Sequence, residues 1–247
     1  ATKRWEADAG EFLRASGRHL RTSPLASRVF GCHFGGGLNG EWHCKGGAYF
    51  PDGGPAMRRA VGAAVPSVER RLGSRTVLLR DPRTDGDVIR FYQRFHQATA
   101  DAIVHFARIV KNASDRQWLA GVFYLYLLEN IQIQEAGHLA PETVLACRDI
   151  DFIVSPYSYL HTNKPGTPTW ESDVVDDAGN WLGRARGVGG DGGYRVPVES
   201  LRRRGKLFIA EVDPSTYLEP RLVHEGGSGH RTVEGCVRIL ERDLGQV

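Results

Sequence analysis

Hydrophobic positions along the chain alternate between continuous runs, which predict buried strands, and spaced patterns, which predict amphipathic helices. Strands are expected where aliphatic and aromatic residues follow one another almost without a break, at residues 28–34, 118–127, 149–156 and 207–210. Helices are expected around them, at residues 6–20, 56–72, 85–110, 142–147, 198–204 and 232–244. Pro66 must break or kink the second of these helices. Strands that alternate with helices are typical of βαβ units and a parallel sheet.

One long segment interrupts this alternation. Residues 161–195 are rich in glycine, proline, aspartate and threonine, and predict a single long loop on the side where the strands end. Loops on that side of a parallel sheet often carry function. Residues 76–79 give a weak fifth strand. The pattern therefore supplies four convincing strands, whereas a complete α/β barrel needs about eight.

Composition and charge narrow the class of protein. The chain has 247 residues, is 41% hydrophobic and shows neither a signal-like start nor an apolar run that spans a bilayer, so we expect one globular domain over residues 1–247. Its net charge of +3 comes from charges spread along the chain, which argues against a nucleic-acid partner. The four cysteines have no disulfide-framework spacing. Reduced thiols and a cytoplasmic location follow, with no membrane partner.

Two of the predicted strands lead to a glutamate. Residues 28–34 run through a glycine-rich turn to Glu41, and residues 207–210 are followed directly by Glu211. Because parallel strands end at one edge of a sheet, two carboxyl groups there indicate glycoside hydrolysis. The retaining form of this reaction needs them about 5–5.5 Å apart, one protonated and one ionised. We expect Trp42 to form an apolar wall that keeps Glu41 protonated, while Glu211 stays ionised. An ordinary ion pair with an arginine is the alternative for each glutamate.

Aromatic and polar side chains near the strand ends are candidates for binding a sugar, because pyranose rings stack on aromatic faces while their hydroxyls bind polar groups. The candidate rings are Trp42, Tyr124, Tyr126, Tyr157, Tyr159, Trp170 and Trp181. Core packing is the alternative for them, above all for Tyr124. Glu129 is a candidate for binding a hydroxyl, with a plain salt bridge as the alternative, and Asp213 is a candidate for orienting the nucleophile or a substrate hydroxyl. His138 is expected to be structural rather than catalytic.

Four segments in order resemble the second half of the barrel in β-galactosidases of glycoside hydrolase family 42 and their uncharacterised relatives, within clan A: residues 123–126, 137–140, 149–159 and 205–213. Enzymes of this clan are retaining. Their acid/base glutamate ends barrel strand four and their nucleophilic glutamate ends strand seven. The resemblance implies that Glu41 is the acid/base and Glu211 the nucleophile. It also implies that Tyr157 or Tyr159 binds Glu211, and that Asn39, separated from Glu41 by Gly40, contacts a sugar hydroxyl.

The resemblance implies a TIM-barrel-like (β/α) fold with parallel strands inside and helices outside. Counterparts of barrel strands one to three and eight are missing from the pattern, so the barrel is expected to be shortened and incomplete. Four strands leave open edges and an apolar face, which favours a homo-oligomer that completes the barrel or the site. The expected function is cleavage of terminal β-glycosides, with β-galactosidase as the expected activity, without a cofactor or metal.

Two other functions stay open at this point. Cys32, His33, His43 and Cys44 flank the glycine-rich turn and are of the residue types that bind zinc, although their spacing matches no familiar zinc signature. The chain is alternatively a non-catalytic carbohydrate-binding or assembly protein that keeps half a barrel and its aromatic residues.

Overall fold

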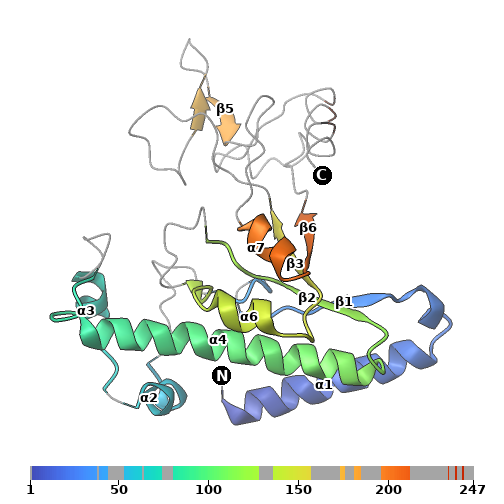
Figure 1. Ribbon diagram of the computed structural model, residues 1–247, viewed down its shortest axis with the longest axis horizontal. Helices are drawn as coiled ribbons and strands as arrows, with labels where there is room; N and C mark the ends of the chain where they lie inside the picture. Colours follow the sequence, from blue (N-terminus) through green and yellow to red (C-terminus); the bar gives the residue numbers. More distant parts are fainter. Residues whose placement is uncertain are drawn as a thin grey trace. The chain divides into compact units, whose positions relative to one another are not determined.

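The computed structural model describes two compact units of the chain (Figure 1). The residues described are 2–37, 39–43, 53–62, 64–73, 80–127, 136–156, 173–175, 181–184, 196–211, 233, 237 and 241. The first unit comprises residues 1–127, 132–154 and 198–208, and the second comprises residues 128–131, 155–197 and 209–247. A single domain over residues 1–247 stays a prediction.

The helices lie close to their predicted positions. They are α1 (Lys3–Thr22), α2 (Pro55–Val61), α3 (Val68–Gly73), α4 (Gly86–Ala113), α6 (Pro141–Ala146) and α7 (Val198–Arg203), with a 3-10 helix η1 (Ala26–Arg28). The predicted helix at 56–72 is two helices, because Gly62 ends α2 in the left-handed conformation and Pro66 precedes α3. In the described part of the chain, no helix is both long and apolar enough to cross a membrane.

The strands confirm the predicted α/β class. They are β1 (Gly31–His33), β2 (Leu119–Phe123), β3 (Phe152–Pro156), β4 (Asp173–Val175), β5 (Trp181–Arg184) and β6 (Leu207–Glu211). Strands β1, β2, β3 and β6 form a four-stranded parallel sheet in that order. The spatial order of these strands is therefore the same as their order in the sequence. A doubly wound sheet differs, because its strand order reverses direction at one point.

The predicted loop at 161–195 is not wholly irregular. Within it, β4 and β5 pair as an antiparallel hairpin in the second unit, with a register shift between Val174 and Val175. Their short lengths of three and four residues explain why no strand pattern stands out in this glycine-rich segment. In the predicted closing helix at 232–244, the described residues Val233, Val237 and Glu241 are helical, while the predicted strand at 76–79 lies outside the described residues.

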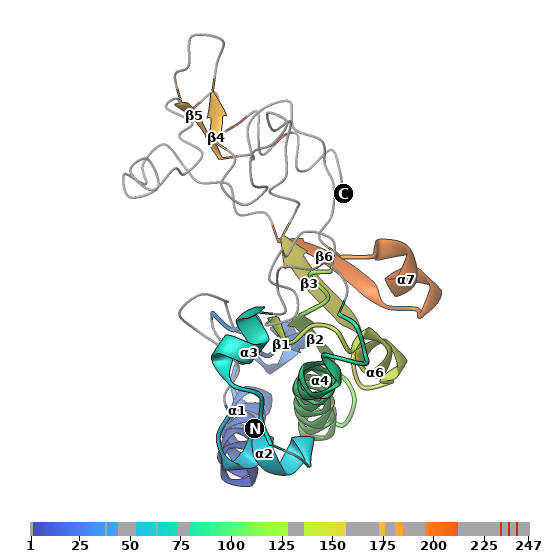
Figure 2. The same cartoon turned by 90° about the vertical axis from the view of Figure 1, so that its left-hand side faces the viewer.

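Helix α4 is the centre of the first unit. Its 28 residues contact α1, α2, α6 and β2 (Figures 1 and 2). Apolar residues at helical spacing bury one face of it, among them Phe91, Ile103 and Phe106. Helix α1 approaches α4 closely at Gly10 and Gly17, where an added Cβ would lie 2.9 Å from Ile109 or Ala113. At Gly17 the close atom is the Cβ of Ala113, which cannot move away, so a side chain there would push the two helices apart.

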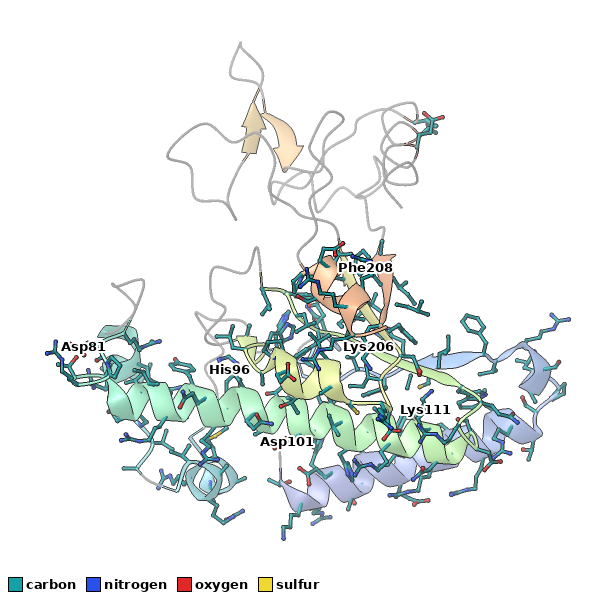
Figure 3. The ribbon with its side chains drawn as sticks, in the orientation of Figure 1. Asp81, His96, Asp101, Lys111, Lys206 and Phe208 are labelled. Atoms are coloured by element: carbon teal, nitrogen blue, oxygen red, sulfur yellow. The ribbon has the colours of Figure 1, made fainter. Side chains whose placement is uncertain are left out.

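Two lysines fasten the amino-terminal ends of the strands (Figure 3). Buried Lys111, on α4, donates to the carbonyl of Trp118 and pairs with Asp151, whose carboxylate also accepts from the backbone N–H of Ala120. Lys206, just before β6, donates to two backbone carbonyls of the segment that leads into β3. Burial lowers the pKa of the Lys206 ammonium. These contacts hold the end of the sheet opposite to the one where Glu41 lies.

Replacing Gly121 by alanine tests the packing of the sheet. A Cβ at this position of β2 would lie 2.2 Å from Cδ2 of Phe152 on β3, so the ring must move. We expect Gly121→Ala to lower the free energy of unfolding by about 2–3 kcal/mol, measured by urea denaturation. Gly86→Ala is the matched control, because its Cβ would meet only the end of Arg90 at 3.5 Å and would stiffen the start of α4. Equal stability of the two variants would contradict the packing of Phe152 on Gly121.

Candidate functional site

The turn that carries Glu41 needs its glycines. It closes through hydrogen bonds from the N–H of Gly36 to the carbonyl of Gly40 and from the N–H of Trp42 to the carbonyl of Gly36. Gly40 is left-handed at φ 80°, and an added Cβ on Gly36 would lie 2.8 Å from the Trp42 ring. Asn39 and Trp42 are also left-handed, at φ 57° and 55°, which is rare outside glycine. Such strain is often found at functional sites.

Trp42 anchors this turn to the core. Its side chain is only 5% exposed, and its Nε1 donates to the carbonyl of Phe34. The indole packs against Phe106 of α4 and Trp5 of α1, with ring centroids 5.9 and 6.5 Å apart. The prediction that Trp42 stacks on a sugar is therefore wrong, because the packing of the core and the backbone of Gly36 cover the ring.

The carboxylate of Glu41 contacts a different residue with each oxygen. The phenol of Tyr126, which follows β2, donates to Oε1 at 3.3 Å. Nε2 of His43 lies 3.3 Å from Oε2. The Glu41 side chain is 18% exposed, whereas that of His43 is 6% exposed. Tyr126 thus hydrogen-bonds the carboxylate and His43 lies beside it, while part of the Glu41 side chain stays exposed.

His138 joins the two segments that meet at Glu41. Its Nδ1 accepts from the backbone N–H of Tyr126 at 3.2 Å, and its Nε2 lies 2.9 Å from the carbonyl of Glu41. Because a backbone N–H can only donate, the hydrogen-bond pattern assigns the proton to Nε2, which then donates to that carbonyl. The side chain is fully buried. These contacts confirm the expectation that His138 is structural.

The residues after β2 are packed as tightly as the core itself. Tyr124, Leu125 and Tyr126 are all fully buried, and Leu125 is left-handed at φ 71°. The phenol of Tyr124 donates to the carbonyl of Gly137, and its burial raises its pKa. This contact confirms the core alternative for Tyr124. Tyr126 instead presents its hydroxyl to Glu41, a polar contact that the sequence did not predict.

The second predicted catalytic residue, Glu211, is the last residue of β6. By the alternation of a strand it shares a face with Leu207 and Ile209. Asn39 is exposed in the glycine-rich turn, and Trp181 begins β5. The remaining predicted site residues lie outside the described residues: Glu129, Tyr157, Tyr159, Trp170 and Asp213.

The zinc alternative finds no support among the described residues. Cys32 and His33 are consecutive in β1, so their side chains point to opposite faces of the sheet. His33 packs on the ring of Phe123, and partial burial lowers its pKa. Burial raises the pKa of the Cys32 thiol, which makes it a poorer metal ligand. Within the described ranges, histidine, cysteine and acidic residues form no group of three or more suited to a metal, and Cys44 lies outside them.

Comparison with protein-family models, curated proteins and solved structures finds no match to this chain. Membership of a glycoside hydrolase family therefore stays a prediction from the sequence. The candidate site is therefore defined by the contacts of Glu41 with Tyr126, His43 and His138.

Replacing His138 tests the structural role of its ring. His138→Leu leaves the N–H of Tyr126 and the carbonyl of Glu41 without these hydrogen bonds in a buried position. We expect a loss of about 2–4 kcal/mol in the free energy of unfolding, measured by chemical denaturation. His105→Leu, at an exposed position of α4, is the control and is expected to change stability by no more than about 0.5 kcal/mol. A similar small effect for both variants would argue against the two hydrogen bonds of His138.

Proposed function

We propose that this protein is a retaining glycoside hydrolase that cleaves terminal β-glycosides, with β-galactosides as the expected substrates. Glu41 is the proposed acid/base and Glu211 the proposed nucleophile. The observation that carries the proposal is the position of the Glu41 carboxylate. It follows β1 at the carboxyl-terminal edge of a parallel sheet and is held by Tyr126 from the end of the neighbouring strand. Parallel α/β enzymes place their chemistry at this edge.

The order of the strands supports a barrel-like fold. Strands β1, β2, β3 and β6 are neighbours in chain order, as consecutive strands of a (β/α) barrel are. We infer that they represent four consecutive strands of an incomplete TIM-barrel-like fold. In that arrangement Glu41 follows the first of the four strands and Glu211 ends the last, which is the spacing of strands four and seven in clan A.

The contacts of Glu41 suit an acid/base. Tyr126 donates to Oε1, which orients the carboxyl group. In the first step, Glu211 attacks the anomeric carbon while Glu41 protonates the departing glycosidic oxygen. In the second step, Glu41 takes a proton from water, which releases the sugar from Glu211. The partial exposure of Glu41 allows a substrate to reach it.

The edge of the sheet supports the proposed self-association. Leu207 and Ile209 of β6 are 55% and 42% exposed, although both are large aliphatic residues. Exposed apolar residues on an edge strand favour pairing with another chain. A second copy of this protein is the proposed partner.

The function is tested with purified protein and a set of nitrophenyl β-glycosides, beginning with the β-galactoside. Glu41→Gln is expected to lower kcat/KM by roughly 10²–10⁴-fold, because general acid catalysis is lost. Glu211→Gln is expected to lower it by about 10⁴-fold or more, because the covalent step is lost. Glu142→Gln is a matched control, since this glutamate on α6 pairs with Arg204 at the surface.

Two further observations separate the roles of the glutamates. A dinitrophenyl glycoside has a leaving group that needs no protonation, so the formation of its glycosyl-enzyme is expected to survive Glu41→Ala and not Glu211→Ala. Added azide is expected to restore turnover of Glu41→Ala and to give a product of retained configuration. If the wild-type protein binds galactosides but hydrolyses none of the substrates, the non-catalytic half-barrel becomes the better explanation.

A further inference from the structure

His33 ends β1, at the edge of the sheet from which the chain leads to Glu41. The next residue, Phe34, is buried and packs on Trp42, which in turn contacts Phe106 of α4. Successive residues of a strand point to opposite faces, so His33 faces away from α4. Parallel strands that are neighbours in chain order, with right-handed connections, place all their crossover helices on one face. His33 therefore lies on the face of the sheet opposite to these helices.

Two phenylalanines from the neighbouring strands hold the His33 ring. In the register of the sheet, His33 lies opposite Gly121, and Gly121 lies opposite Phe152. Because Gly121 has no side chain, the Phe152 ring extends over it, and its centroid lies 6.3 Å from that of His33. Phe123, the last residue of β2, meets the His33 ring edge-to-face at 4.4 Å. Packing on side chains of β2 and β3 therefore orients the imidazole.

The ring nitrogens of His33 are available to a ligand. The side chain is exposed, and among the residues that the structure describes none forms a hydrogen bond with the ring. Contact with the two phenylalanines removes part of the ring from water and lowers the pKa of His33. At neutral pH the imidazole is therefore neutral, with one nitrogen that donates and one that accepts. A sugar hydroxyl also donates and accepts, so it suits either nitrogen.

The glycine-rich turn returns the chain to the end of β1. An added Cβ on Gly35, two positions after His33, would lie 3.0 Å from the Cα of Gly40. The N–H of Gly36 donates to the carbonyl of Gly40, and Gly36 forms a parallel bridge with Glu41. The backbone of Glu41 is therefore held beside the end of the strand that carries His33.

We propose that His33 is a sugar-binding residue, whose imidazole hydrogen-bonds a hydroxyl of the β-galactoside on which Glu41 acts. Side chains at the carboxyl-terminal ends of parallel strands form the ligand sites of α/β enzymes, and His33 is such a side chain. Phe123 and Phe152 hold its ring in place. His33 takes no part in breaking the glycosidic bond, so it contributes to the affinity for the sugar and not to the chemical step. This role deepens the proposed function and rests on it.

The first test measures binding without turnover. Isopropyl β-thiogalactoside is the probe, because its glycosidic sulfur resists hydrolysis. We expect it to shift the ring resonances of His33 in an NMR titration and to leave those of His105 unchanged. His33→Phe keeps an aromatic ring beside Phe123 but loses both ring nitrogens, so we expect the Kd to rise about 3- to 10-fold. His105→Phe is the matched control, since His105 is also exposed and also meets a phenylalanine edge-on.

The second test separates affinity from the chemical step. For the nitrophenyl β-galactoside, His33→Phe is expected to raise KM by about the same factor and to change kcat by less than about twofold, because His33 binds the ground state and the transition state alike. His33→Gln restores one donor and one acceptor and is expected to recover part of the affinity. The urea denaturation midpoints of both variants are expected to stay close to that of wild type, because the position is exposed.

The two tests distinguish the role of His33 from the proposed function. A shift of His33 and a weaker Kd in His33→Phe, in a protein that hydrolyses no glycoside, would support the sugar-binding role and overturn the glycosidase. Hydrolysis of the galactoside with Kd and KM unchanged in His33→Phe would support the glycosidase and overturn the role of His33. A protein that neither binds the thiogalactoside nor cleaves the nitrophenyl substrates would overturn both.

Discussion

The burial of one face of α4 is the interaction on which the rest of the first unit depends. This helix contacts α1, α2, α6 and β2, so the elements that flank the sheet are placed by a single apolar surface. Each large side chain that it fully buries contributes roughly 1.5–3 kcal/mol, and Phe91, Ile103 and Phe106 are among them. Glycines on α1 let the two long helices approach closely.

The site depends on this core through Trp42. The indole packs on Phe106 of α4, and the residues on either side of it, Glu41 and His43, are thereby set at the carboxyl-terminal edge of the sheet. His138 adds a second constraint, because it connects the carbonyl of Glu41 to the N–H of Tyr126. These two contacts join the residues that follow the glycine-rich turn to the core. The carboxylate is therefore positioned before any ligand binds, which is the condition for efficient acid/base chemistry.

Much of the fold could be predicted from the sequence because its signals are local. The aliphatic run of β3 and the apolar spacing along α4 depend on neighbouring residues, and proline and glycine mark the break between α2 and α3. The β4–β5 hairpin was missed because strands of three and four residues in a glycine-rich segment have too few positions to show alternation. For the candidate site, the sequence indicated that Glu41 follows β1 and that Glu211 lies at the end of β6, whereas it did not indicate which side chains contact Glu41.

The sequence by itself determined most of the elements, the α/β class, the position of Glu41 after β1 and that of Glu211 at the end of β6, since these follow from hydrophobic periodicity and chain order. Only the tertiary structure decided the roles of Trp42, His43 and Tyr126. An aromatic residue next to Glu41 could either stack on a sugar or pack in the core. In the structure, Trp42 is buried and packs against Phe106. His43 and Tyr126 are separated by 83 positions in the sequence and meet at one carboxylate. Contacts of this kind depend on how the strands pair and how the turn folds. A local sequence pattern therefore cannot predict which distant side chains meet.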